Sequence, residues 1–98
     1  MANICDNTFF AYSECEENLK HIYEFIGEHF DSDLEYYDGT NVEGYFTSRW
    51  VFPEEHMKDM FESMPNKEDI YMRCLSVEYG CLYHALWVCD GEDGWEEV

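Results

Sequence analysis

Paired carboxylates are the commonest motif in this sequence that could do chemistry. Glu16-Glu17, Glu54-Glu55 and Glu96-Glu97 each place two acids side by side. Such a pair serves as general acid and base when one member is shielded and its pKa is perturbed. With 23 Asp or Glu among 98 residues, however, pairs of this kind arise by chance. The pairs therefore do not indicate a catalytic site, and we expect no enzymatic activity.

Cysteine and histidine supply the other reactive side chains. The sequence has five cysteines, an odd number with no C-x-x-C pair, and its four histidines show no H-x-x-x-H or H-E-x-x-H spacing. The cysteines are Cys5, Cys15, Cys74, Cys81 and Cys89. Structural zinc sites usually contain closely spaced ligand pairs. We therefore predict reduced cysteines that pack as small apolar residues. A cysteine–histidine nucleophile pair stays open, because spatial neighbours are not visible in a sequence.

Oxygen-rich stretches raise the question of calcium. Asp38-Gly39 and the run from Asp90 to Asp93 are rich in carboxylates. Neither follows the twelve-residue loop with a closing Glu that a dedicated calcium site requires. No Gly-rich phosphate loop is present either, since the glycines are scattered singly. We predict no metal site and no cofactor.

The net charge is the strongest global signal. Only 5 Lys or Arg oppose the 23 acids, for a net charge of −18, yet 46% of the chain is hydrophobic and 18% is aromatic. A disordered acidic segment has few aromatics, so the composition predicts a folded domain with an anionic surface. Direct binding of DNA or RNA needs Lys and Arg to neutralise phosphates, and we expect none. The apolar runs are too short to cross a bilayer, the first residues do not resemble a signal peptide, and anionic lipids would repel this surface. The prediction is a cytoplasmic protein that does not bind membranes.

Hydrophobic periodicity predicts seven elements in the order β-α-β-β-α-β-β. Ser13 and Glu16 have the spacing of a capping box at the first helix, and Pro53 suits the first residue of the second. The predicted strands span residues 3–12, 33–38, 43–51, 69–79 and 81–89, and the predicted helices span 14–30 and 53–64. This order predicts an α+β fold, a ferredoxin-like two-layer sandwich with both helices on one face of an antiparallel sheet.

The domain organisation follows from length and composition. Residues 1–90 are predicted to form a single domain, and residues 91–98 an acidic C-terminal tail that only Trp95 could pin to it. Both faces of the last two predicted strands carry bulky residues, so the helix-free face is predicted to hold an aromatic patch that includes Tyr83 and Trp87. Patches of this kind mark partner or dimer surfaces.

Two stretches carry a resemblance to a known family. One is the start Met1, Ala2, Asn3, Cys5 and Asn7. The other runs from Phe46 to Pro53 (FTSRWVFP) and continues through a helix, Met64-Pro65, Glu78-Tyr79-Gly80 and Asp90-Gly91. Together they resemble the small ferredoxin-like proteins of the YubB/Api type, carried by phages and plasmids. The family usually has Trp where this chain has Ile4. The resemblance implies the fold and a mobile-element origin, and it carries over no catalytic residue.

A run of carboxylates with neighbouring tyrosines is the candidate partner-binding site. It follows the first predicted helix and the strand after it, where Glu24, Glu28 and Asp31 persist although the helix dipole disfavours them. The predicted site residues are Glu14, Glu17, Glu24, Glu28, Asp31, Asp33, Glu35, Tyr36, Tyr37 and Asp38. Such a run can occupy a groove lined with Lys and Arg in place of nucleic acid, with fast, salt-sensitive encounter. The alternative is that these acids only form a solvated surface. That interpretation explains an acidic protein, but it explains a net charge as large as −18 less readily.

Two functional hypotheses follow. The first is a phage inhibitor of a host nucleic-acid-targeting defence complex, an anti-CRISPR or anti-restriction protein that acts as an acidic nucleic-acid mimic in the basic channel of its target. The second is a non-enzymatic adaptor or oligomerisation module, with a protein partner or a second copy bound through the aromatic sheet face. Substitution of Tyr83 or Trp87 would then abolish binding, whereas reversal of Glu24 and Glu28 would abolish it under the first hypothesis.

Overall fold

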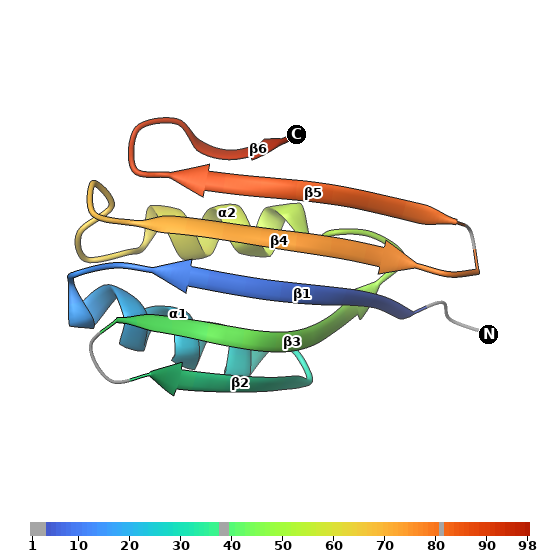
Figure 1. Cartoon of the computed structure of the whole chain (residues 1–98), viewed down its shortest axis with the longest axis horizontal. Helices are drawn as coiled ribbons and strands as arrows, with labels where there is room; N and C mark the ends of the chain where they lie inside the picture. The colour runs from blue at the N-terminus through green and yellow to red at the C-terminus, as the bar shows by residue number, and fades with distance from the viewer. Residues whose placement is uncertain (1–3, 38–39, 81) are drawn as a thin grey trace.

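The structure is a computed structural model that describes residues 4–37, 40–80 and 82–98. It has an α+β fold in which two helices cover one face of a six-stranded antiparallel sheet (Figure 1). The strands are β1 (Ile4–Tyr12), β2 (Ser32–Tyr37), β3 (Asn41–Arg49), β4 (Tyr71–Glu78), β5 (Tyr83–Asp90) and β6 (Gly94–Glu97), and the helices are α1 (Glu16–His29) and α2 (Glu54–Glu62).

The sheet order is β2-β3-β1-β4-β5-β6, and every neighbouring pair is antiparallel. β1 therefore lies in the middle, with β3 between it and β2. Alternation explains the two faces of β1, because Cys5, Asn7, Phe9 and Ala11 are buried toward the helices while most of the residues between them are exposed. We call the opposite surface of the sheet, which is turned toward the viewer in Figure 1, the open face.

The expected C-terminal tail is instead a strand, so the predicted element order lacked β6. The Asp90 carboxylate accepts hydrogen bonds from the backbone N–H groups of Glu92 (2.9 Å) and Asp93 (2.7 Å) and so closes a turn. Gly94 follows at φ +72°, a conformation that favours glycine. Trp95 is then buried and donates its indole N–H to the Met57 carbonyl at 2.9 Å. Residues 94–97 thereby belong to the sheet.

The predicted capping box does not form. α1 begins at Glu16 after Cys15, and no side chain caps it. The Ser13 hydroxyl lies two residues too early and instead donates to the Asp69 carbonyl, so it ties the end of β1 to the loop before β4. Leu19, Ile22 and Ile26 of α1 then pack on the sheet as their spacing predicts.

The predicted aromatic patch was assigned to the wrong face. The Trp87 ring stacks on Phe52 at 4.5 Å, and the Tyr83 hydroxyl accepts a hydrogen bond from the Phe52 backbone N–H at 3.5 Å. Phe52 is buried in the segment that joins β3 to α2. Tyr83 and Trp87 therefore lie on the helix side, and the open face of β5 carries His84, Leu86 and Val88 instead.

Three cysteine thiols are buried on the helix side. Burial raises the pKa of Cys74 and of Cys89 to about 12, and it also raises the pKa of Cys5. Cys74 and Cys5 both donate to the Asn7 side-chain oxygen, at 3.8 Å each. A protonated, enclosed thiol is a poor nucleophile, so these residues have structural roles.

Stability should therefore fall at alkaline pH. A thiol whose pKa is higher in the folded state stabilises the fold fully below its unfolded pKa, about 8.5 to 9, and loses that contribution as pH rises toward about 12. We expect the free energy of unfolding to decline over this window in urea titrations. The Cys74→Ala variant should decline less steeply, and parallel curves for the two proteins would contradict the assignment.

Candidate acidic partner-binding surface

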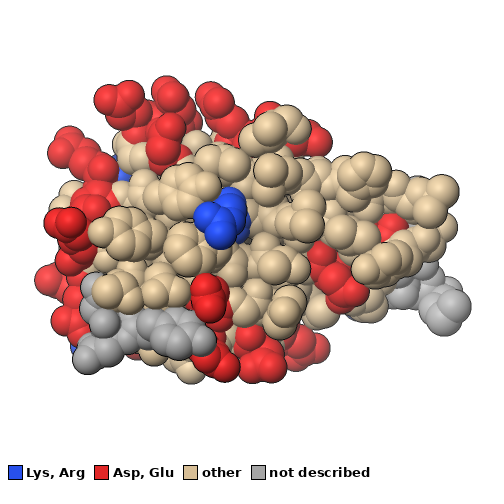
Figure 2. All heavy atoms as spheres, viewed as in Figure 1, with Lys and Arg blue, Asp and Glu red and all other residues tan. Residues whose placement is uncertain are grey.

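Three segments that are distant in sequence bring their carboxylates to one end of the molecule. The Glu14 backbone N–H donates to the Asp69 carboxylate at 3.4 Å, and the Gly91 backbone lies so close to the Glu68 carbonyl that an added Cβ would come within 2.3 Å of it. We call this surface the acidic end. It consists of Glu14, Glu16, Glu17, Glu68, Asp69, Asp90, Glu92 and Asp93. Figure 2 shows acidic side chains crowded at the left of the view, the end where β5 turns into β6 in Figure 1.

Asn18 holds this end together. Its side chain is fully buried, donates to the Asn66 carbonyl (2.7 Å) and the Asp69 carbonyl (3.0 Å), and accepts from the Asn66 backbone N–H (2.9 Å). The first turns of α1 are thereby fixed to the loop before β4. The carboxylates consequently sit on a rigid frame although they repel one another.

Removal of that frame should be measurable. Asn18→Ala leaves partly buried backbone groups of Asn66 and Asp69 without these partners, so we expect a loss of about 1 to 2 kcal/mol in the free energy of unfolding. Urea denaturation gives the value, and amide hydrogen exchange should rise first in residues 66–69. The exposed variant Lys20→Ala serves as control on the same helix. An equal loss in both variants would contradict the role of Asn18.

The predicted run of site residues does not form one surface. Glu14 and Glu17 belong to the acidic end, whereas Glu24 and Glu28 are exposed farther along α1, about 10 and 16 Å from Glu17 along the helix axis. Asp31 is exposed at the other end of α1. Glu14 and Glu17 therefore lie beside acids from later segments of the chain and not beside the other predicted site residues.

The remaining predicted residues lie on or near the edge strand β2. Asp33 pairs with Tyr45 and Glu35 with Glu43, which places both acids on the open face. Tyr36 is half-buried on the helix side, with its ring 6.1 Å from that of Tyr23, so it is a packing residue. Asp38 and the side chain of Tyr37 lie outside the described residues.

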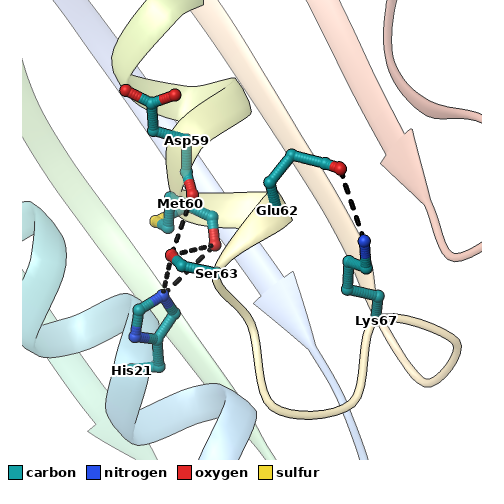
Figure 3. Close-up of polar contacts among 6 residues, drawn as sticks. All are labelled: His21, Asp59, Met60, Glu62, Ser63 and Lys67. Atoms are coloured by element: carbon teal, nitrogen blue, oxygen red, sulfur yellow. Dashed lines mark hydrogen bonds and ion pairs between the residues drawn. The ribbon is translucent and has the colours of Figure 1, made fainter.

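A serine–histidine contact joins the two helices but lacks the geometry of a nucleophile. Figure 3 shows His21 from α1 aimed at the last turn of α2, with its Nε2 2.9 Å from the Ser63 hydroxyl and 3.2 Å from the Met60 carbonyl. Because the Ser63 hydroxyl donates to the Asp59 carbonyl at 2.8 Å, His21 Nε2 serves as the donor, the opposite of a general base. The contact caps α2.

Among the described residues, the ion pairs involve Lys58 and Lys67 and lie at the surface. Lys67 bonds Glu62 at 3.3 Å, on the side of the α2 terminus away from His21 (Figure 3), and Lys58 bonds Glu54 at 2.6 Å. Exposed pairs of this kind contribute little to stability, and neither pair involves a carboxylate of the acidic end. Within the described residues no group of three or more His, Cys, Asp or Glu is arranged to hold a metal ion. Neither α1 nor α2 is long and apolar enough to span a membrane.

The open face differs from the acidic end. Figure 2 looks onto this face and shows a largely uncharged centre with one basic side chain and acids around the rim. A shallow pocket of about 560 Å³ lies here. Asp33, Glu35 and Glu43 line one side of it, and Arg73, Leu75 and Leu86 line the other.

Sequence reasoning missed Glu68, Asp69, Asp90, Glu92 and Asp93. The signal that could have found them is the strand register, because Tyr12, Tyr71 and Asp90 lie opposite one another in adjacent strands. Whatever follows Tyr12, precedes Tyr71 or follows Asp90 must meet at the same end of the sheet. The chain matches no protein-family model, and no curated protein and no solved structure was found to be similar to it.

Proposed function

We propose that this protein is a non-enzymatic inhibitor encoded by a mobile element such as a phage. It occupies the basic nucleic-acid channel of a host defence complex, a CRISPR effector or a restriction enzyme, and acts as an acidic mimic of DNA or RNA. Its inhibition is stoichiometric. We also propose that the fold is a ferredoxin-like sandwich extended by two strands, since β3 lies between β1 and β2 while β1 lies between β3 and β4.

One observation carries the proposal. Every described Asp or Glu except Glu43, Asp69 and Glu78 is exposed on a domain of net charge −18. A surface of this kind destabilises the compact state through self-repulsion. The acidic end concentrates the repulsion instead of spreading it, at a place that hydrogen bonds of the buried Asn18 side chain hold together. A basic partner surface neutralises these carboxylates, so binding relieves the repulsion between them.

The mechanism is competition for the same cations. Nucleic acid binds a protein channel largely through phosphates that Lys and Arg neutralise. The carboxylates of the acidic end meet those cations in a fixed arrangement and pay little ordering entropy on binding. Long-range attraction speeds the encounter and weakens with salt. Binding by nucleic acid and by this protein then exclude each other.

An affinity pull-down from a bacterial lysate tests the proposal. The tagged protein is washed with buffers of low and then high salt, and the eluates are identified by mass spectrometry. We expect a nucleic-acid-binding defence complex that elutes with salt and with added DNA or guide RNA. Recovery of partners that are indifferent to salt and to nucleic acid would count against mimicry.

A second candidate function rests on the open face. Tyr45, Leu75 and Leu86 are exposed there beside the pocket, and exposed apolar patches mark protein interfaces. This favours a non-enzymatic adaptor or oligomerisation module whose working residues are these three rather than Tyr83 and Trp87. Substitution of Leu75 by Asp would then abolish partner binding while reversals at the acidic end would not.

A further inference from the structure

We propose that the open face is a homodimer interface in which Arg73 of each copy pairs with Glu43 of the other. This inference does not depend on nucleic-acid mimicry. It starts from apolar side chains that the fold leaves uncovered in the middle of the sheet. Tyr45 is 63% exposed, Leu75 44% and Leu86 37%, and all three lie in one row across β3, β4 and β5.

The surroundings of Arg73 provide a second line of evidence for this interface. Its guanidinium lies 4.3 Å from the centre of the Phe10 ring and 6.0 Å from that of Tyr71. Among the described residues the ion pairs involve Lys58 and Lys67, and none involves Arg73. In a chain with 23 acids, an exposed arginine that stacks on aromatic rings and pairs with no carboxylate in the described part of its own chain is suited to a carboxylate from another molecule.

The strand register makes the face complementary to itself. Glu43, Phe10 and Arg73 lie opposite one another on β3, β1 and β4, so Phe10 is midway between the acid and the arginine. Consider a two-fold axis that lies in the interface plane and runs along β1. It places β3 of one copy opposite β4 of the other. Arg73 then faces Glu43 twice, and Tyr45 faces Leu75 twice. This reciprocity is the property of an isologous contact.

The pocket extends the same complementarity. Its acidic side carries Asp33, Glu35 and Glu43, and its other side carries Arg73, Leu75 and Leu86. The same axis places the acidic side of one copy against the arginine side of the other. A basic peptide would match only the first side and would meet Arg73 on the second, which is why the observations favour a second copy.

The face is large enough for a stable contact. The two longer dimensions of the molecule, 39 and 25 Å, bound it (Figure 1), and a standard interface buries roughly 800 Å² on each partner. Two sheets pack face to face in this way in β-sandwiches. The helices and the acidic ends then lie on the outside of the dimer and remain accessible.

Charge predicts an unusual salt dependence. The acidic rim makes two copies repel each other, and added salt screens that repulsion more than it screens a desolvated Arg73–Glu43 pair. The dimer should therefore tighten as NaCl rises from about 0.05 to about 0.5 M. Binding to a basic partner should weaken over the same range, so failure of one proposal is distinguishable from failure of the other.

A charge swap tests the proposal by sedimentation equilibrium. We expect the wild-type protein to have twice its 11.8 kDa chain mass. Arg73→Glu and Glu43→Arg should each raise the dimer dissociation constant about tenfold or more, and the double variant R73E/E43R should restore the dimer. Lys67→Glu makes the same charge change as Arg73→Glu in an exposed pair elsewhere, and it should leave the dimer intact.

The restored double variant also shows that the single variants fail through charge and not through misfolding, which circular dichroism of each variant checks independently. A wild-type protein that stays at 11.8 kDa up to about 100 μM in high salt overturns the proposal. A dimer that survives both single reversals also overturns it, because the contact would then use another face. Folded single variants that the double reversal does not rescue overturn the Arg73–Glu43 pairing.

Discussion

Reversal of three charges at the acidic end is expected to weaken binding to a basic partner about 100-fold at low salt. The variant E17K/E68K/E92K changes one residue in each of the three segments that form this end, and all three side chains are exposed. Electrostatic steering accounts for 10- to 1,000-fold of association rates, so most of the loss should appear in the association rate. Surface plasmon resonance against the captured complex, at two salt concentrations, measures it.

The matched control places the same charge change at the far end. E28K/D31K/E55K also reverses three exposed acids, but these lie at the end of α1 and the start of α2. We expect it to lose less than about tenfold, through net charge alone. Equal losses in the two triple variants would mean that the charge acts as a whole and that the acidic end has no special role.

Trp95→Ala should destabilise the protein by about 3 to 5 kcal/mol. Trp95 is the buried centre of β6, its ring lies 5.2 Å from that of Phe52, and its indole N–H bonds the Met57 carbonyl of α2. The substitution opens a cavity between the sheet and α2 and removes that hydrogen bond. Small domains have a total free energy of unfolding of about 5 to 15 kcal/mol. Urea denaturation should therefore show that little of this free energy remains in the variant.

Two further variants separate the packing of the Trp95 ring from its hydrogen bond and from the general effect of removing a tryptophan. Trp95→Phe keeps a ring and loses the hydrogen bond, so it should cost about 1 to 2 kcal/mol beyond a small packing term. Trp50→Ala removes a tryptophan that is 48% exposed, and it should destabilise the protein clearly less than Trp95→Ala does. A loss of less than about 1 kcal/mol for Trp95→Ala would return residues 91–98 to the role of a loosely attached tail.

Periodicity was sufficient to predict the α+β class and the first seven elements. The predicted apolar stripe of α1 is buried at Leu19, Ile22 and Ile26, whereas Tyr23, which belonged to the same predicted stripe, is exposed. In β1 the alternation from Cys5 to Ala11 buries one side of the strand. These signals are local, because one face of each element meets the core. The element ends differ from the predicted ones by at most two residues, as in β3, which was predicted over 43–51 and spans Asn41–Arg49.

The faces of β5 could not be assigned from sequence. Tyr83 and Trp87 on one side and Leu86 and Val88 on the other are equally bulky, so alternation gives no direction. Phe52 decides it, because it comes from the segment before α2 and stacks on Trp87. That contact depends on the order of the sheet, which local patterns do not encode.

The candidate site was predicted only in part for the same reason. Glu14 and Glu17 were identified because they are close in sequence to other acids. Their neighbours in space, such as Glu68 and Glu92, come from loops that only the register of β1, β4 and β5 brings together. Asn18, which fixes one of those loops, carries no sequence signal beyond a polar residue on the buried side of a helix.

We propose that this protein takes the place of nucleic acid in a basic channel. The most direct test is a displacement titration, in which the protein is added to purified CRISPR effector and restriction complexes that hold fluorescently labelled nucleic acid. Nucleic-acid mimicry predicts that the anisotropy falls to the value of free nucleic acid at one equivalent of protomer per channel, and that the E17K/E68K/E92K variant fails to displace the nucleic acid. Unchanged anisotropy at large excess with every complex would contradict the claim.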